Sequence, residues 1–177
     1  MLTVLLGGAR SGKSSWAETT GRRAQGTVTY LATCPRIPGD TDLDERIERH
    51  RSDRPASWTT LEEDVDLAGA IGRAEPGHLI IDCLTLWVNN LQFQGRTAAE
   101  IHAASTAALT AVAGRIGDTV AVSNEVGSGI VPSDPATRAY RDLLGRINQQ
   151  WAAAADRVLF LAAGRAIALH DPDDFLR

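Results

Sequence analysis

The residues GGARSGKS at positions 7–14 combine glycines, a lysine and a serine in the spacing G-x-x-x-x-G-K-[ST]. Glycines allow backbone conformations in which successive N–H groups converge on one point at the start of a helix, where phosphate oxygens bind. Lys13, a candidate catalytic residue, supplies a positive charge for the β- and γ-phosphates, and the Ser14 hydroxyl is suited to ligating Mg²⁺. A glycine-rich turn without a ligand is the alternative, but the flanking pattern of strand and helix favours a phosphate-binding loop. The nucleotide-binding residues predicted here are Gly7, Gly8, Ala9, Arg10, Ser11, Gly12, Lys13 and Ser14.

His50 is a second candidate, because several arginines lie close to it in the sequence: Arg46, Arg49, Arg51 and Arg54. Positive charges disfavour the imidazolium form and attract phosphates, and a histidine nucleophile that attacks a phosphoryl group needs both conditions. The alternative is a solvated amphipathic helix in which the histidine lies at the edge of the apolar stripe. Spacing alone leaves both interpretations open.

Asp82 is a candidate ligand of the same Mg²⁺. It ends the apolar run HLIID at residues 78–82, which is typical of a buried parallel strand with a carboxylate at its C-terminal edge. This is the Walker B position, where a carboxylate holds the metal through its water shell. Many strands also end in aspartate simply to begin a turn, so the assignment depends on the phosphate-binding loop.

Glu125 follows another predicted strand, at residues 118–123, and begins the glycine-bearing loop NEVGSGIVP at residues 124–132. The carboxylate is therefore expected at the same edge of the sheet, where it is a candidate substrate contact. Ile130 and Val131 are neighbouring apolar residues in this loop, and exposed apolar loop residues favour a substrate-facing or subunit-facing role. A plain connection between two elements is the alternative.

The elements that position these side chains follow from the spacing of apolar and β-branched residues. Strands are predicted over residues 2–6, 27–33, 59–61, 78–82, 118–123 and 157–162. Helices are predicted over residues 14–24, 42–53, 62–73, 84–91, 98–116 and 135–151, with Thr97 and Asp134 as caps of the last two. After Gly164 only a short acidic tail is expected. The alternation predicts a single nucleotide-binding α/β domain over residues 1–177, a P-loop NTPase-like three-layer sandwich with a mainly parallel sheet.

Composition narrows the class of protein. The chain has 177 residues, a net charge of −4, and 44% hydrophobic and 23% charged residues, which suits one globular domain. The negative charge argues against a nucleic acid as the main partner and favours a small phosphorylated substrate. Because the N-terminus has no basic region and no apolar run approaches the roughly 20 residues that span a bilayer, we expect a cytoplasmic protein without a membrane span. Cys34 and Cys83 are too few for a disulfide framework and are expected to be reduced thiols.

Taken together, the motifs resemble those of the adenosylcobinamide kinase / adenosylcobinamide-phosphate guanylyltransferase family. The resemblance is carried by GGARSGKS (7–14), Ala32-Thr33, RIERHRSDRPASW (46–58), Glu62, DCLTLWVNNL (82–91), NEVGSGIVP (124–132) and GRINQ (145–149). Members of this family are bifunctional enzymes of cobalamin biosynthesis. They phosphorylate the aminopropanol hydroxyl of adenosylcobinamide and then transfer GMP from GTP to that phosphate, which gives adenosylcobinamide-GDP.

The resemblance implies that His50 becomes guanylylated, which agrees with the interpretation of an arginine-surrounded nucleophile. Its neutral imidazole nitrogen would attack the α-phosphorus of GTP in line, with pyrophosphate leaving against Lys13 and the loop amides. In the kinase reaction, Asp82 or Glu125 would orient the substrate hydroxyl. The resemblance further implies nucleotide contacts at Ala32, Thr33, Cys34, Arg51, Ser52, Asp53, Arg54, Glu62 and Asp82. It also implies Mg²⁺ as cofactor, ATP or GTP as phosphate donor, a corrinoid substrate and a homotrimer with sites near the subunit contacts.

Two other functions remain compatible with the phosphate-binding loop. In a plain small-molecule kinase, His50 would only contact a phosphate, and no GMP-labelled protein would form. In a non-catalytic GTP-binding module, GTP would bind without turnover of any cobinamide. The bifunctional enzyme is preferred because it alone gives His50 and its arginines a clear purpose.

Overall fold

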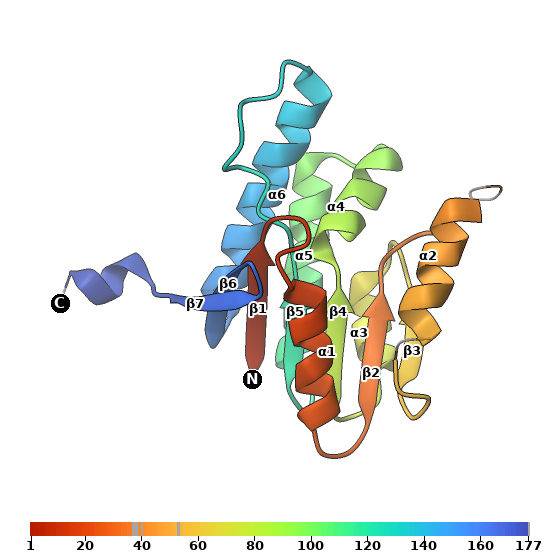
Figure 1. The fold of residues 1–177 in the computed structure, drawn as a ribbon. Coiled ribbons are helices and arrows are strands. Elements are labelled where there is room, and N and C mark those ends of the chain that lie inside the picture. The colour runs from red at the N-terminus through yellow and green to blue at the C-terminus, as the bar shows by residue number, and fades with distance from the viewer. Residues whose placement is uncertain (37–38, 40, 53, 177) are drawn as a thin grey trace.

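A computed structural model describes residues 1–36, 39, 41–52 and 54–176, and their side chains except those of residues 43, 44, 46, 49 and 50. These residues contain a seven-stranded sheet in the order β3-β2-β4-β5-β1-β6-β7 (Figure 1). The strands are β1 (Leu2–Gly7), β2 (Val28–Ala32), β3 (Thr59–Glu62), β4 (His78–Asp82), β5 (Thr119–Val122), β6 (Arg157–Ala162) and β7 (Arg165–Leu169). The helices are α1 (Lys13–Arg23), α2 (Thr41–Ser52), α3 (Leu67–Arg73), α4 (Leu84–Phe93), α5 (Ala98–Ala113), α6 (Pro135–Ala154) and a 3-10 turn (Pro172–Phe175).

The sheet is the middle of three layers, as the sequence predicts. Every strand pair is parallel except β6 with β7. Helix α1 packs on one face, whereas α3, α4, α5 and α6 cover the other (Figure 1). The mainly parallel α/β sandwich is therefore confirmed.

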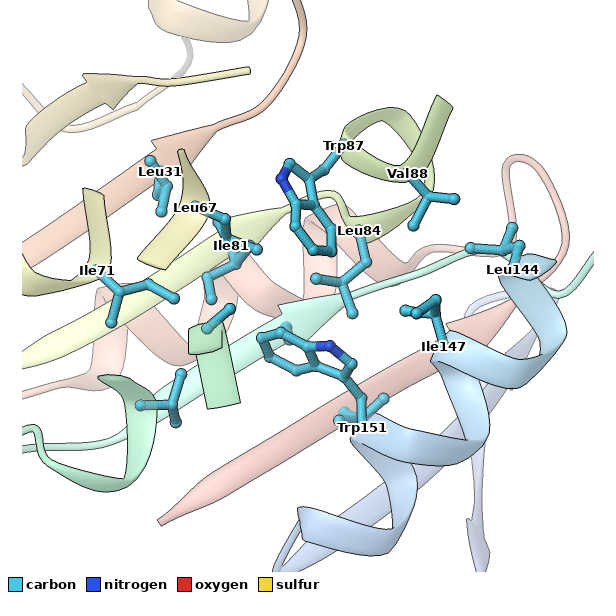
Figure 2. Packing of buried hydrophobic residues seen from close by; sticks show 14 of the residues in the cluster. Leu31, Leu67, Ile71, Ile81, Leu84, Trp87, Val88, Leu144, Ile147 and Trp151 are labelled. Atoms are coloured by element: carbon cyan, nitrogen blue, oxygen red, sulfur yellow. The ribbon is translucent and has the colours of Figure 1, made fainter. Parts of the chain in front are cut away.

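The larger core lies between the sheet and the helices α3 to α6. Trp87 from α4 and Trp151 from α6 are both fully buried in it, together with Leu84 (Figure 2). Both indoles keep a hydrogen bond, because Trp87 Nε1 donates to the backbone carbonyl of Val65 at 2.8 Å and Trp151 Nε1 donates to Ser105 Oγ at 3.0 Å. The two rings therefore bury a large apolar area without leaving a polar atom unpaired.

Two helix starts follow the predicted caps. The Thr97 hydroxyl accepts from the Glu100 amide, and the Glu100 carboxylate accepts in return from the Thr97 amide, a capping box at the start of α5. The Asp134 carboxylate accepts from the Thr137 amide at 2.7 Å, and Pro135 opens α6. Helix α5 nevertheless ends at Ala113 rather than at residue 116.

The helix predicted over residues 62–73 begins only at Leu67. Glu62 instead pairs with Ala32 as the last residue of β3. The carboxylate of Glu63 then accepts hydrogen bonds from the amides of Val65 and Asp66, which holds the intervening turn. Pairing between strands thus overrides the helical propensity of this acidic stretch.

Strand β7 is absent from the prediction, which expected only a tail after Gly164. It pairs antiparallel with β6, and the turn between them places Ala163 and Gly164 at φ values of +50° and +72°. The Gly164 amide donates to the carbonyl of Ser11 at 2.9 Å. The hairpin therefore supports the glycine-rich loop from one side.

Three further observations concern the cysteines, membrane spans and clusters of metal-binding side chains. Cys34 and Cys83 are both reduced cysteines, as expected. Within the described ranges, no helix is long and apolar enough to cross a membrane. The same residues contain no group of three or more histidine, cysteine, aspartate or glutamate side chains arranged to hold a metal ion.

Candidate active site

The glycine-rich loop connects the end of β1 to the start of α1. Gly12, at φ +101°, is the residue that precedes the helix, and Arg10 also has a positive φ of +54°. The first amides of α1 have no partner within the helix, so this end carries the partial positive charge that binds anions. The loop therefore has the position and backbone shape of a phosphate-binding site.

Gly7 is expected to tolerate no larger residue, whereas Gly8 in the same loop should accept one. A Cβ at Gly7 would lie 2.3 Å from the carbonyl oxygen of Leu161, and its φ is +150°; a Cβ at Gly8 would meet nothing within 4 Å. Gly7→Ala should lower the free energy of unfolding by about 1–3 kcal/mol. Gly8→Ala should change it by less than about 0.5 kcal/mol. Urea unfolding of both variants measures the difference, and equal stabilities would contradict the described contact.

Lys13 places its ammonium group inside this loop. Its side chain is 6% exposed, and Nζ donates to the carbonyl of Gly8 at 2.7 Å and lies 3.3 Å from Ser11 Oγ. Burial lowers the pKa of Lys13, and the nearby Asp82 carboxylate opposes that shift. The ammonium group is therefore held within the glycine-rich loop.

The predicted site residues lie side by side along the carboxyl edge of the sheet. The strand order brings the end of β3 at Glu62, of β2 at Ala32 and of β4 at Asp82 next to one another. The next two strands, β5 and β1, lead to Glu125 and Gly7, and the Glu125 amide donates to the Gly7 carbonyl at 3.0 Å. The expected gathering of the loop, Asp82 and Glu125 at one edge is confirmed, and ligands of open α/β sheets bind at this edge.

Both the carboxylate and the backbone carbonyl of Asp82 accept hydrogen bonds, from β2 and from the residue that follows it. The Tyr30 hydroxyl donates to Asp82 Oδ2 at 2.5 Å, and the Thr33 amide donates to the Asp82 carbonyl at 3.1 Å. Thr33 is fully buried, and its hydroxyl exchanges hydrogen bonds with the backbone of Cys83. Burial raises the pKa of the Cys83 thiol to about 12, so this neighbour of Asp82 is neutral at ordinary pH.

A buried polar network anchors the loop that carries Glu125. Ser123 Oγ donates to Asn148 Oδ1 at 2.6 Å, and Asn148 Nδ2 donates to the carbonyl of Asn124 at 3.0 Å. The Asn124 amide donates in turn to Thr85 Oγ1 at 2.7 Å, so strand β5 is tied to both α6 and α4. Sequence reasoning assigned no role to Asn148, although its spacing from Trp151 places an amide on the apolar face of α6.

Replacing Asn148 by alanine should destabilise the protein, whereas the same change at the neighbouring Gln149 should not. Asn148 is 5% exposed, and its loss would leave the Asn124 carbonyl without its side-chain donor and Ser123 Oγ with only its 3.3 Å contact to Thr85 Oγ1. An unsatisfied buried group costs about 1–3 kcal/mol, so Asn148→Ala should lower the free energy of unfolding by at least about 1 kcal/mol. Gln149 is exposed on the same helix. Thermal unfolding of the two variants checks this, and equal melting temperatures would rule out the network as an anchor.

Helix α2, which contains His50, lies at the end of the sheet formed by β2 and β3 (Figure 1). His50 belongs to α2, but its side chain and the whole of Asp53 lie outside the described residues. Glu62 connects this helix to the sheet edge, because its carboxylate lies 3.8 Å from Arg51 Nη1 and 3.2 Å from Arg36 Nη2. These pairs are exposed and contribute little to stability.

Together, the strand, the glycine-rich loop with its lysine and serine, and the following helix define a P-loop nucleotide-binding protein. A family model described as cobinamide kinase / cobinamide phosphate guanyltransferase matches residues 3–169. The chain belongs to this family, and the resemblance found in the sequence is confirmed.

Curated relatives match along nearly their whole length. The bifunctional adenosylcobalamin biosynthesis protein CobP of Pseudomonas aeruginosa is 39% identical, with 96% of this chain and 97% of the relative covered. The corresponding CobU proteins of Salmonella typhimurium and Escherichia coli are each 36% identical, with 96% of this chain and 99% of each relative covered.

Solved structures with a similar fold include ATPases of bacterial type III secretion systems. A prototypical ATPase has a TM-score of 0.56 at 11% identity, over 91% of this chain and 52% of that one. EscN from enteropathogenic E. coli has a TM-score of 0.54 at 11% identity, over 92% of this chain and 43% of that one. The chain thus spans only about half of these ATPases, and the likeness at this identity shows the fold alone.

Proposed function

We propose that this protein phosphorylates adenosylcobinamide and then transfers GMP from GTP to the resulting phosphate through a guanylylated histidine. The observation that carries the proposal is the family match over residues 3–169, combined with the position of the P-loop, Asp82 and Glu125 at one edge of the sheet. The substrate class, a corrinoid with a free hydroxyl, follows from the names of the family and of the relatives.

In the kinase reaction, the loop amides and Lys13 would bind the β- and γ-phosphates of ATP or GTP. Ser14 and Asp82 offer a hydroxyl and a carboxylate oxygen, the hard donors that Mg²⁺ prefers, and would hold the ion. Bound there, Mg²⁺ supplies positive charge against the phosphate oxygens. Glu125 would orient the substrate hydroxyl, since its backbone is hydrogen-bonded to Gly7 at the mouth of the loop.

In the transferase reaction, a neutral imidazole nitrogen of His50 would attack the α-phosphorus of GTP. A P–N bond forms while the P–O bond to pyrophosphate breaks, and the loop and Lys13 stabilise the leaving pyrophosphate. The phosphate of the corrinoid then attacks the same phosphorus, releases His50 and takes the GMP. The nucleotide site around this histidine would be lined by Arg51, Ser52, Asp53, Arg54 and Glu62, together with Ala32 and Cys34. Thr33 is fully buried and would support this site through its hydrogen bonds to the backbone of Cys83.

We also propose that the protein assembles as a homotrimer, as its family resemblance implies. Ile130 is 97% exposed and Val131 is 60% exposed in the loop that follows Glu125. Apolar side chains on such a loop fit either a contact with a second subunit or a contact with the corrinoid. Light scattering measures the molar mass of the wild type and of Ile130→Asp. A trimeric wild type and a smaller variant would indicate a subunit contact, whereas an unchanged mass would fit a contact with the corrinoid.

Product analysis tests the proposed function against its two rivals. The protein is incubated with adenosylcobinamide, Mg²⁺ and GTP, or ATP in its place, and the corrinoids are identified by mass. The bifunctional enzyme gives the phosphate with either or both donors and the GDP derivative only with GTP. A plain kinase stops at the phosphate, and a GTP-binding module gives neither product.

A further inference from the structure

Tyr30 contacts two parts of the candidate site at once, although none of the steps above uses it. It lies on β2 and is 2% exposed. Its hydroxyl donates to Asp82 Oδ2 at 2.5 Å, and the guanidinium carbon of Arg54 lies 3.4 Å from the centre of its ring. We propose that Tyr30 is a positioning residue that orients the Asp82 carboxylate through its hydroxyl and seats the end of the histidine-bearing helix α2 through its ring. This inference rests on the proposed function.

The hydroxyl link follows from the register of the sheet. Tyr30 pairs with Ile80 on β4, two residues before Asp82, so all three side chains lie on the same face of the sheet. The tyrosine ring extends from its own position towards the end of β4 and delivers its hydroxyl to the carboxylate. One carboxylate oxygen of Asp82 is thereby fixed, which sets the direction of the other.

The ring link follows from the surroundings of Arg54. The Arg54 amide donates to the carbonyl of Arg51 at 3.3 Å, so Arg54 continues from the last turn of α2. Its Nε is buried and has no hydrogen-bond partner among the described residues, and its Nη1 makes a long contact of 3.5 Å to Thr60 Oγ1. Among the described residues, the ring face of Tyr30 is therefore the main contact of this half-buried guanidinium.

A residue that only filled the core would not need both contacts. Tyr30 does pack with Leu5 and Ile80 beneath α1, and phenylalanine would fill the same volume. The hydroxyl and the ring face, however, reach the two elements that act in different halves of the proposed reaction. The two links can therefore be removed separately.

The test compares Tyr30→Phe, which removes the hydroxyl alone, with Tyr30→Leu, which removes the hydroxyl and the ring. Tyr140→Phe is the matched control, because it removes a tyrosine hydroxyl that donates to the Thr85 carbonyl at 3.0 Å outside the proposed machinery. Three quantities are measured in the full-length protein: the Mg²⁺ concentration needed for half-maximal GTP binding, the fraction of protein guanylylated at saturating Mg²⁺ and GTP, and amide hydrogen exchange over residues 41–52.

We expect Tyr30→Phe to raise the half-maximal Mg²⁺ concentration about tenfold, a usual effect of losing one hydrogen bond to a charged group. Its guanylylated fraction and its exchange over residues 41–52 should match the wild type. Tyr30→Leu should show the same Mg²⁺ effect, at least about tenfold less guanylylation, and faster exchange in α2. Compared with leucine, phenylalanine at position 30 should thus restore guanylylation and slow exchange in α2, but it should not restore the Mg²⁺ dependence of GTP binding.

The proposal is overturned if Tyr30→Phe and Tyr140→Phe behave alike, or if the Phe and Leu variants lose both properties to the same extent. Failure of the proposed function is a separate result. If the wild type forms no guanylylated protein, Mg²⁺-dependent GTP binding still tests the hydroxyl link and amide exchange still tests the ring link.

Discussion

Replacing His50 by asparagine is expected to abolish covalent labelling of the protein by GTP that carries its label on the α-phosphate. Asparagine keeps a polar side chain but has no nitrogen that can attack phosphorus, so GMP transfer should fall by at least about a thousandfold. Phosphorylation of adenosylcobinamide should fall by less than about threefold, because the loop that presents the γ-phosphate belongs to β1 and α1. One substitution would therefore separate the two activities.

The control for this variant is His102→Asn, a histidine on α5, which packs with the helices on the opposite side of the sheet from α1. It should retain both activities and the full label. The label on the wild type should be labile in acid and stable in base, as a phosphoramidate is. Persistent label on His50→Asn would place the nucleophile elsewhere, and an unlabelled wild type with kinase activity would leave the plain kinase as the function.

The parts of the fold that could be predicted from the sequence are those with local signals. The spacing from Gly7 to Ser14 is read within one strand-loop-helix unit, and the capping box of Thr97 and Glu100 lies within four residues. Asp82 could be placed because an apolar run ending in an acid is a local pattern, and parallel strands bring their carboxyl ends to the same edge. These predictions needed no knowledge of which strands are neighbours.

The features that were missed depend on contacts between distant segments. Strand β7 is short and exposed, and it forms because β6 offers an open edge next to it. Asn148 lies on the buried face of a helix, and its partners Ser123 and Asn124 come from the segment that follows β5. Tyr30 looked like an ordinary strand residue, because both groups that it contacts are more than 20 residues away in sequence. Only the strand order reveals such pairs.

Lys13→Met is expected to reduce both half-reactions by about 100- to 1,000-fold, the usual effect of removing one preorganised charge from a site where negative charge develops. The loop binds the γ-phosphate in the kinase reaction and the departing pyrophosphate in the transferase reaction, so the two activities should fall together, in contrast to His50→Asn. Methionine matches the unbranched lysine side chain up to Cε, and removing the ammonium also removes the burial cost that lowers the pKa of Lys13. The melting temperature should therefore stay the same or rise.

Steady-state kinetics of both reactions, with thermal unfolding alongside, measure this difference, and the exposed Arg23→Met at the other end of α1 is the matched control. Arg23→Met should leave both rates within about twofold, because an exposed surface charge at that distance is screened by solvent. If Lys13→Met lost the kinase but transferred GMP at the wild-type rate, pyrophosphate would not leave against this loop. The two reactions would then use different phosphate sites, and the triphosphate would have to bind in a second orientation to bring its α-phosphorus to His50.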